Sequence, residues 1–104
     1  MTSTAQGYGV EATLEPEALT IRATSKAGRM SVFGADPRDE VTIPLHEIAS
    51  AKHVRPPKVL LGAVNGTLVV RTEAGVRYQL NYRAKKNADF GPLADAIVEA
   101  VTPA

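Results

Sequence analysis

The chain of 104 residues contains no cysteine and no tryptophan. Without cysteine it can form no disulfide, no thiolate metal site and no thiol nucleophile. It also has no apolar run near the roughly 20 residues that a helix needs to span a bilayer. The N-terminus is small and polar and lacks the basic and then apolar segments of a secretory signal. We therefore expect a cytoplasmic protein.

The length and composition describe one globular domain. Hydrophobic residues make up 44% and charged residues 22% of the chain, as in folded proteins and unlike disordered ones. A chain near the modal domain size leaves no room for a second domain with its own core, which excludes two-domain enzyme architectures. Residues 1–8 lack apolar periodicity. We expect a flexible tail there and one domain over residues 9–102.

The residue types that perform catalysis are not arranged as an active site. His46 and His53 are seven positions apart, with no further ligand at metal-binding spacing, and we expect them at the surface or rim of the fold. Ser31 and Ser50 lack the glycine elbow of a nucleophilic serine. The sequence therefore predicts no enzyme, no metal and no cofactor, and it implies no small-molecule substrate.

Apolar and polar residues alternate with period two along most of the chain, which indicates half-buried antiparallel strands. The turns between them contain glycine, proline, aspartate and glutamate, notably at residues 15–17 and 73–75. The expected strands are residues 10–14, 19–23, 30–33, 41–44, 51–55, 67–72 and 76–82.

The period changes near the C-terminus, where apolar residues fall at helical spacing. These positions are Phe90, Leu93, Ala94, Ile97, Val98 and Val101. Asp95 and Glu99 would then face water. With Asp89 as N-cap, Pro92 falls in the first turn, whose amides have no helical partner. We expect a helix that starts there and stops at Thr102 and Pro103.

These elements predict an α+β domain, in which one C-terminal helix covers an open end or face of a small antiparallel barrel. The layout is similar to the pleckstrin-homology-like (PH-like) β-barrel of about seven strands in two sheets. Three stretches resemble an actinobacterial family of uncharacterised PH-like domains, in which an "IPL..I" segment, an "LVNG" strand start and a "K..N..F..L..AI" helix recur. They are residues 43–48, 63–66 and 85–97.

The resemblance covers roughly residues 10–101, and its motifs are structural. It implies a binding or scaffolding module without catalytic residues. The family often occurs as tandem copies, sometimes beside a short oligomerisation module. This chain departs from the family in having no tryptophan.

Charge is unevenly distributed along the chain. Residues 49–88 have a net charge of +7, whereas residues 1–48 and 89–104 each have −3. If the basic residues share a surface, it would attract an anionic partner or the acidic segments of a neighbouring copy. Alternatively, strand alternation simply places them in solvent. They are Lys52, Arg55, Lys58, Arg71, Arg77, Arg83, Lys85 and Lys86, with Glu73 as the one acidic residue.

The segment 56–64 begins with two prolines and continues as an apolar run. It could form a buried strand, with Asn65 and Gly66 as a tight hairpin turn. It could also form a loop over one end of the barrel, with Asn65 and Gly66 opening the next strand at a bulge. We favour the loop.

We expect a partner-binding surface formed by this loop and the basic residues beside it: Lys52, Arg55, Lys58, Leu60, Leu61, Arg83, Lys85 and Lys86. Protein–protein interaction or self-association is the leading hypothesis, and peripheral binding to anionic membrane is the alternative. Glu15 and Glu17 in the first hairpin loop would repel a phosphoinositide headgroup. Weak nucleic-acid binding ranks third, because most of the five aromatic residues fall on core faces.

Overall fold

Seven strands form two antiparallel sheets, in a computed structural model that describes residues 2–34, 38–54, 65–83 and 87–101. The first sheet has the order β1-β2-β3-β4 and the second the order β5-β6-β7. The strands are β1 (Ser3–Gln6), β2 (Val10–Leu14), β3 (Ala18–Ala23), β4 (Glu40–Pro44), β5 (Ile48–Val54), β6 (Asn65–Thr72) and β7 (Arg77–Arg83). The helices are α1 (Lys26–Phe33), the short 3-10 turn η1 (Leu45–Glu47) and α2 (Asn87–Val101).

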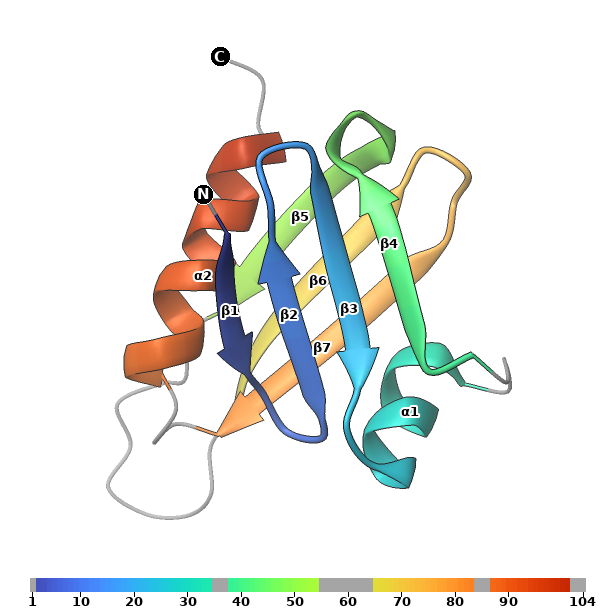
Figure 1. The fold of residues 1–104 in the computed structure, drawn as a ribbon, viewed down its shortest axis with the longest axis vertical. Helices are drawn as coiled ribbons and strands as arrows, with labels where there is room; N and C mark the ends of the chain where they lie inside the picture. Colours follow the sequence, from blue (N-terminus) through green and yellow to red (C-terminus); the bar gives the residue numbers. More distant parts are fainter. Residues whose placement is uncertain (1, 35–37, 55–64, 84–86, 102–104) are drawn as a thin grey trace.

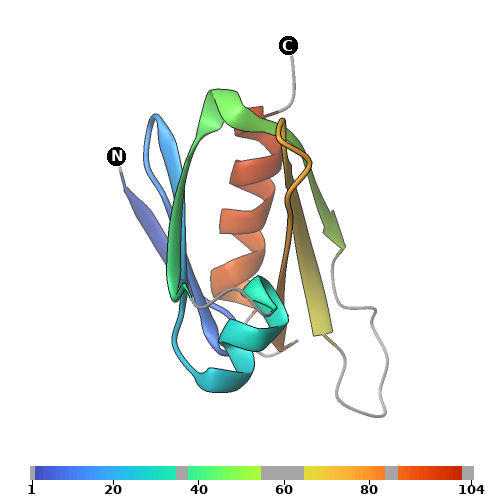
Figure 2. The ribbon, with the colours of Figure 1, turned by 90° about the vertical axis from the view of Figure 1, so that its right-hand side faces the viewer.

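The two sheets face each other as layers, and the strands of the second run diagonally behind those of the first (Figures 1 and 2). Helix α2 packs against β5 and β1 and so covers the side of the sandwich where those two edge strands lie. The predicted fold class is thus confirmed: an α+β domain with seven antiparallel strands in two PH-like sheets, capped by a C-terminal helix. No helix in the described ranges is long and apolar enough to cross a membrane.

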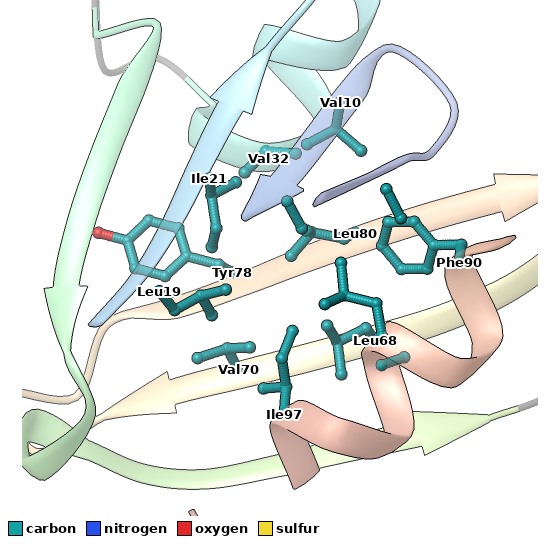
Figure 3. Close-up of a cluster of buried hydrophobic side chains, with 14 of the residues drawn as sticks. Val10, Leu19, Ile21, Val32, Leu68, Val70, Tyr78, Leu80, Phe90 and Ile97 are labelled. Carbon is teal, nitrogen blue, oxygen red and sulfur yellow. The ribbon is translucent and has the colours of Figure 1, made fainter. Parts of the chain in front are cut away.

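The core lies between the sheets and consists of the inward half of each alternating strand. Figure 3 shows side chains from β2, β3, β6 and β7 meeting Phe90 and Ile97 of α2. Among its ring contacts, Phe33 meets Tyr78 edge-on with 6.0 Å between the ring centres, and Tyr82 stacks on Phe90 at 4.8 Å. The largest fully buried side chains are Tyr82, Phe90, Leu19, Ile21, Leu68, Leu80, Ile97, Val10 and Val70.

Helix α2 buries the apolar face that its sequence predicts, with Phe90, Leu93 and Ile97 in the core. Its expected start is wrong, because the helix begins at Asn87 and Asp89 lies in the first turn rather than at the N-cap. Pro92 therefore lies beyond the first turn and removes one helical hydrogen bond. Burial of Phe90 against Tyr82 supplies a tertiary contact that stabilises this turn.

The strand predicted at residues 30–33 is instead the end of helix α1. Ser25 caps the helix, since its side chain accepts a hydrogen bond from the Gly28 amide at 3.0 Å. Gly34 ends it with a φ of 61°, and its amide donates to the Met30 carbonyl at 3.0 Å. Met30 is 60% exposed whereas Phe33 is buried. Residues 30–33 are too few to distinguish the period of a strand from that of a helix. The caps at Ser25 and Gly34 favour the helix.

The flexible tail predicted over residues 1–8 is wrong for Ser3–Gln6, which forms β1 and pairs with β2. Ala5 lies opposite Ala12 in this pair and is buried. A strand of four residues with one small buried side chain gives almost no period-two signal, so the sequence did not reveal it.

The pairing of β1 predicts that a charge at its one buried position destabilises the fold. Ala5→Asp should lower the free energy of unfolding by about 2 kcal/mol or more, because a carboxylate would be buried without a partner. Ser3→Asp is the matched control: Ser3 is exposed on the same strand and should tolerate the charge. Urea unfolding of both variants measures the difference, and equal stabilities would mean that residues 3–6 do not pair with β2.

Candidate functional site

The outer surface of the second sheet gathers basic side chains that are far apart in the sequence. Because strand side chains alternate, the neighbours of the buried Leu68, Val70 and Leu80 point away from the core. We call this surface the basic face. It consists of Ser50, Lys52, Val54, Thr67, Val69, Arg71, Arg77, Gln79, Asn81 and Arg83.

The pairing register places two arginines side by side on the basic face. Arg71 of β6 lies directly opposite Arg77 of β7. Lys52 belongs to the neighbouring row, opposite Val69. Arg83 lies at the far end of β7. Both ends of the face are therefore basic, and apart from Lys52 the side chains between them are uncharged.

No acidic residue occurs on β5, β6 or β7. The nearest acidic residues in the chain are Glu47, before β5, and Glu73, after β6. Within the described part of the chain, neither they nor any other carboxylate forms an ion pair with a basic-face cation. Like charges directly opposite each other on a sheet are destabilising. The Arg71–Arg77 pair thus leaves an uncompensated positive charge on the surface.

Hydrogen bonds hold the neutral middle of the basic face in place. Arg77 Nη2 donates to Gln79 Oε1 at 3.2 Å, and Gln79 Nε2 donates to Asn81 Oδ1 at 3.4 Å. Thr67 Oγ1 donates to the same Asn81 oxygen at 3.2 Å. Arg77 is the one charged group among these hydrogen-bonded side chains. The bonds therefore order the surface without cancelling its positive charge.

The far end of the basic face contains an arginine stacked on an aromatic ring. The guanidinium carbon of Arg83 lies 4.7 Å from the centre of the Tyr8 ring. Tyr8 is 52% exposed, and its amide donates to the Asn81 carbonyl at 2.8 Å. This cation–π contact orients Arg83 and leaves its charge in place.

Two of the predicted partner-binding residues, Lys52 and Arg83, lie on the basic face. The other six lie outside the described residues, as does segment 56–64: Arg55, Lys58, Leu60, Leu61, Lys85 and Lys86. Asn65 and Gly66 belong to β6, so the alternative of a hairpin turn at these two residues is wrong. They open the strand as the favoured alternative predicts, but pair with β7 in continuous register, without the expected bulge.

The sequence did not single out Arg71 and Arg77 as site residues. Alternation predicts that Arg77 points outward with Gln79 and Asn81. It does not show which β6 residue lies opposite Arg77. The turn at residues 73–75 sets that register, so applying a hairpin register to this turn could have found the pair.

A second polar cluster lies inside the fold, where one histidine joins the second sheet to α2. His53 Nδ1 lies 2.7 Å from Asp95 Oδ1, and His53 Nε2 lies 2.6 Å from the Tyr82 hydroxyl oxygen. The His53 side chain is only 4% exposed, so the expectation of a surface or rim histidine is wrong for His53. His46, with a side chain 82% exposed, agrees with that expectation.

Hydrogen-bond chemistry fixes the direction of the bond between His53 and Asp95. An ionised carboxylate can only accept, so Nδ1 of His53 donates to Asp95. In the neutral imidazole Nε2 accepts from the Tyr82 hydroxyl, and in the protonated ring it donates to that oxygen. Tyr82 is fully buried and stacks on Phe90. A hydroxyl enclosed in this way is not presented to a substrate, and the arrangement suits the attachment of α2 to the sheet.

In the ranges that the structure describes, no group of three histidine, cysteine, aspartate or glutamate side chains is placed to hold a metal ion.

The buried cluster predicts a stability cost for removing one oxygen atom. Tyr82→Phe keeps the ring but takes the hydroxyl partner from His53 Nε2, and should lower the free energy of unfolding by about 1–3 kcal/mol. The matched control is Tyr78→Phe, since Tyr78 is also buried and its hydroxyl makes no hydrogen bond within the described residues. It should change stability by at most about 0.5 kcal/mol. Equal losses in urea unfolding would contradict the role of the cluster.

Gly66 is predicted to be required because the Tyr82 ring lies directly over it. A Cβ atom at residue 66 would overlap the Tyr82 ring and hydroxyl. Gly66→Ala should therefore displace the ring, shift the imidazole NMR signals of His53 and cost about 1–3 kcal/mol. Gly75→Ala is the control, because its Cβ meets nothing within 4 Å and only its φ of 87° is strained. Unchanged His53 signals in Gly66→Ala would refute the contact.

Comparison with known proteins adds no relative to this description, since no family model, curated protein or solved structure matches the chain.

Proposed function

We propose that this protein is a non-catalytic binding module whose basic face binds an acidic segment of a protein partner. One observation supports this above all. Arg71 and Arg77 lie directly opposite each other, and no carboxylate of the described residues forms an ion pair with either, so an anion supplied by a partner would relieve their repulsion. The resemblance to PH-like binding modules agrees with this role, although a fold alone does not determine a function.

The neutral middle of the basic face favours a polypeptide as the partner. Gln79 and Asn81 present amide groups and Thr67 presents a hydroxyl, all able to hydrogen-bond a peptide backbone. Arginines at the ends can each bind a carboxylate with two parallel hydrogen bonds. Such a surface combines charged anchors with polar contacts, as protein interfaces do.

The two alternative ligands fit this surface less well. Single-stranded nucleic acid needs exposed aromatic rings on which bases stack, but Phe33, Tyr78, Tyr82 and Phe90 are buried and Tyr8 is covered on one side by Arg83. A membrane surface would favour large apolar side chains beside the cations. The described part of the basic face offers only two valines.

Reversing the charge of the arginine pair should abolish binding to an acidic peptide. The probe is a short fluorescent oligoglutamate, whose affinity we expect to fall at least about tenfold in Arg71→Glu/Arg77→Glu, equivalent to roughly 1.4 kcal/mol. Fluorescence anisotropy at low salt measures this, and added salt should weaken wild-type binding. The matched control is Lys26→Glu/Arg29→Glu on α1, which changes the net charge equally but lies off the basic face.

The same titration with two other anions separates the alternatives. Tight binding of phosphatidylglycerol vesicles or of oligothymidylate, without binding of oligoglutamate, would replace the proposed function by membrane or nucleic-acid binding. An equal loss of oligoglutamate affinity in the α1 control would show that net charge, rather than the basic face, is responsible.

A further inference from the structure

We propose that the acidic partner of the basic face is helix α2 of a second copy of this chain. This inference rests on the proposed function, because it names the occupant of the same surface. Helix α2 has a net negative charge, because residues 87–101 contain three acidic residues and no basic residue. One of them, Asp95, is bonded to His53. The other two, Asp89 and Glu99, are exposed.

The exposed residues of α2 lie on one side of the helix. They are separated by three or four positions, the spacing of neighbours on a helical surface. This α2 outer surface consists of Asp89, Pro92, Ala96, Glu99 and Ala100. It lies opposite the side that packs into the core through Phe90, Leu93 and Ile97. The acidic groups are thus near its two ends, with small uncharged residues between them.

The charge pattern of the α2 outer surface complements that of the basic face. Asp89 and Glu99 are ten residues apart, or about 15 Å along the helix axis. Arg77 and Arg83 are six residues apart on β7, or about 20 Å along the strand. Arginine side chains are long and flexible enough to make up the difference between these two spacings. Because Pro92 and Ala96 are small, the helix can approach the neutral middle of the sheet closely.

The two surfaces of one copy cannot meet each other. Helix α2 packs its apolar side against β5 and β1, so its acidic side points out of the sandwich, and the basic face points out of the second sheet. Figure 2 shows the helix and this sheet as adjoining parts of one body. The contact is therefore made between copies, and it is head-to-tail because it joins two different surfaces.

Two variants break the contact from opposite sides. Arg71→Glu/Arg77→Glu reverses the basic face, and Asp89→Lys/Glu99→Lys reverses the α2 outer surface. Sedimentation velocity at low salt should show wild-type mass rising with concentration above the monomer, and each variant alone should lose this association. Glu99→Lys alone is the second helix variant, because a lysine in the last turn suits the helix dipole and should leave the fold intact.

Mixing the variants tests the pairing itself. The face variant retains a native α2, and the helix variant retains a native basic face. An equimolar mixture should therefore associate again, with the two variants alternating, because the two native surfaces bind each other and the two reversed surfaces do the same. The chain with all four substitutions should associate again, because both surfaces are reversed together. Circular dichroism confirms that each variant is folded before it is compared.

Three results would overturn the inference: a wild-type protein that stays monomeric at every concentration, association that neither reversal weakens, or a mixture that fails to pair. The oligoglutamate titration separates these from failure of the proposed function. Binding of the peptide through Arg71 and Arg77 by a strictly monomeric protein would leave the acidic-partner function standing and remove only the second copy as the partner.

Discussion

The attachment of α2 to the second sheet through His53 is the interaction on which the rest of the fold depends. The imidazole joins Asp95 of the helix to Tyr82 of the central core. A buried histidine is costly unless both nitrogens are bonded, so this geometry allows one placement of the helix. Tyr82 in turn stacks on Phe90 and covers Gly66. The hydrogen bonds from Asp95 through His53 to Tyr82 thereby set the position of the helix, the packing of the Tyr82 ring and the need for glycine in β6.

That attachment also determines which charges the surface presents. Because the apolar side of α2 faces the core and Asp95 is turned toward His53, Asp89 and Glu99 are left on the outside. On the sheet, the inward positions are filled by aliphatic and aromatic side chains, so every cation of β5, β6 and β7 points outward. An acidic helix surface and a basic sheet surface are thus consequences of how one core is packed.

The sequence predicts the strands and helices that have a clear hydrophobic period. It does not predict the contacts between side chains that are distant in the sequence. The alternation of β2, β3, β6 and β7 and the helical spacing of α2 are strong, because several buried residues repeat in each. Strand β1 and helix α1 are too short for a clear period. His53 finds its partners 29 and 42 residues away, and Arg71 meets Arg77 only through the register of a turn. Such contacts have no local signal. Of the predicted partner-binding residues, the structure describes Lys52 and Arg83, which lie on the basic face, and the other six lie outside the described residues.

The first sheet shows that this chain can neutralise an exposed sheet surface. Across its outer side Glu11 lies opposite Arg22, which lies opposite Glu40, so charges of alternating sign are neighbours on adjacent strands. The second sheet, with strands of similar length, instead places Arg71 opposite Arg77. A surface that served only solubility would gain stability from the alternating arrangement. The destabilising pair is confined to one sheet, which is the pattern expected where a surface is completed by an anionic partner.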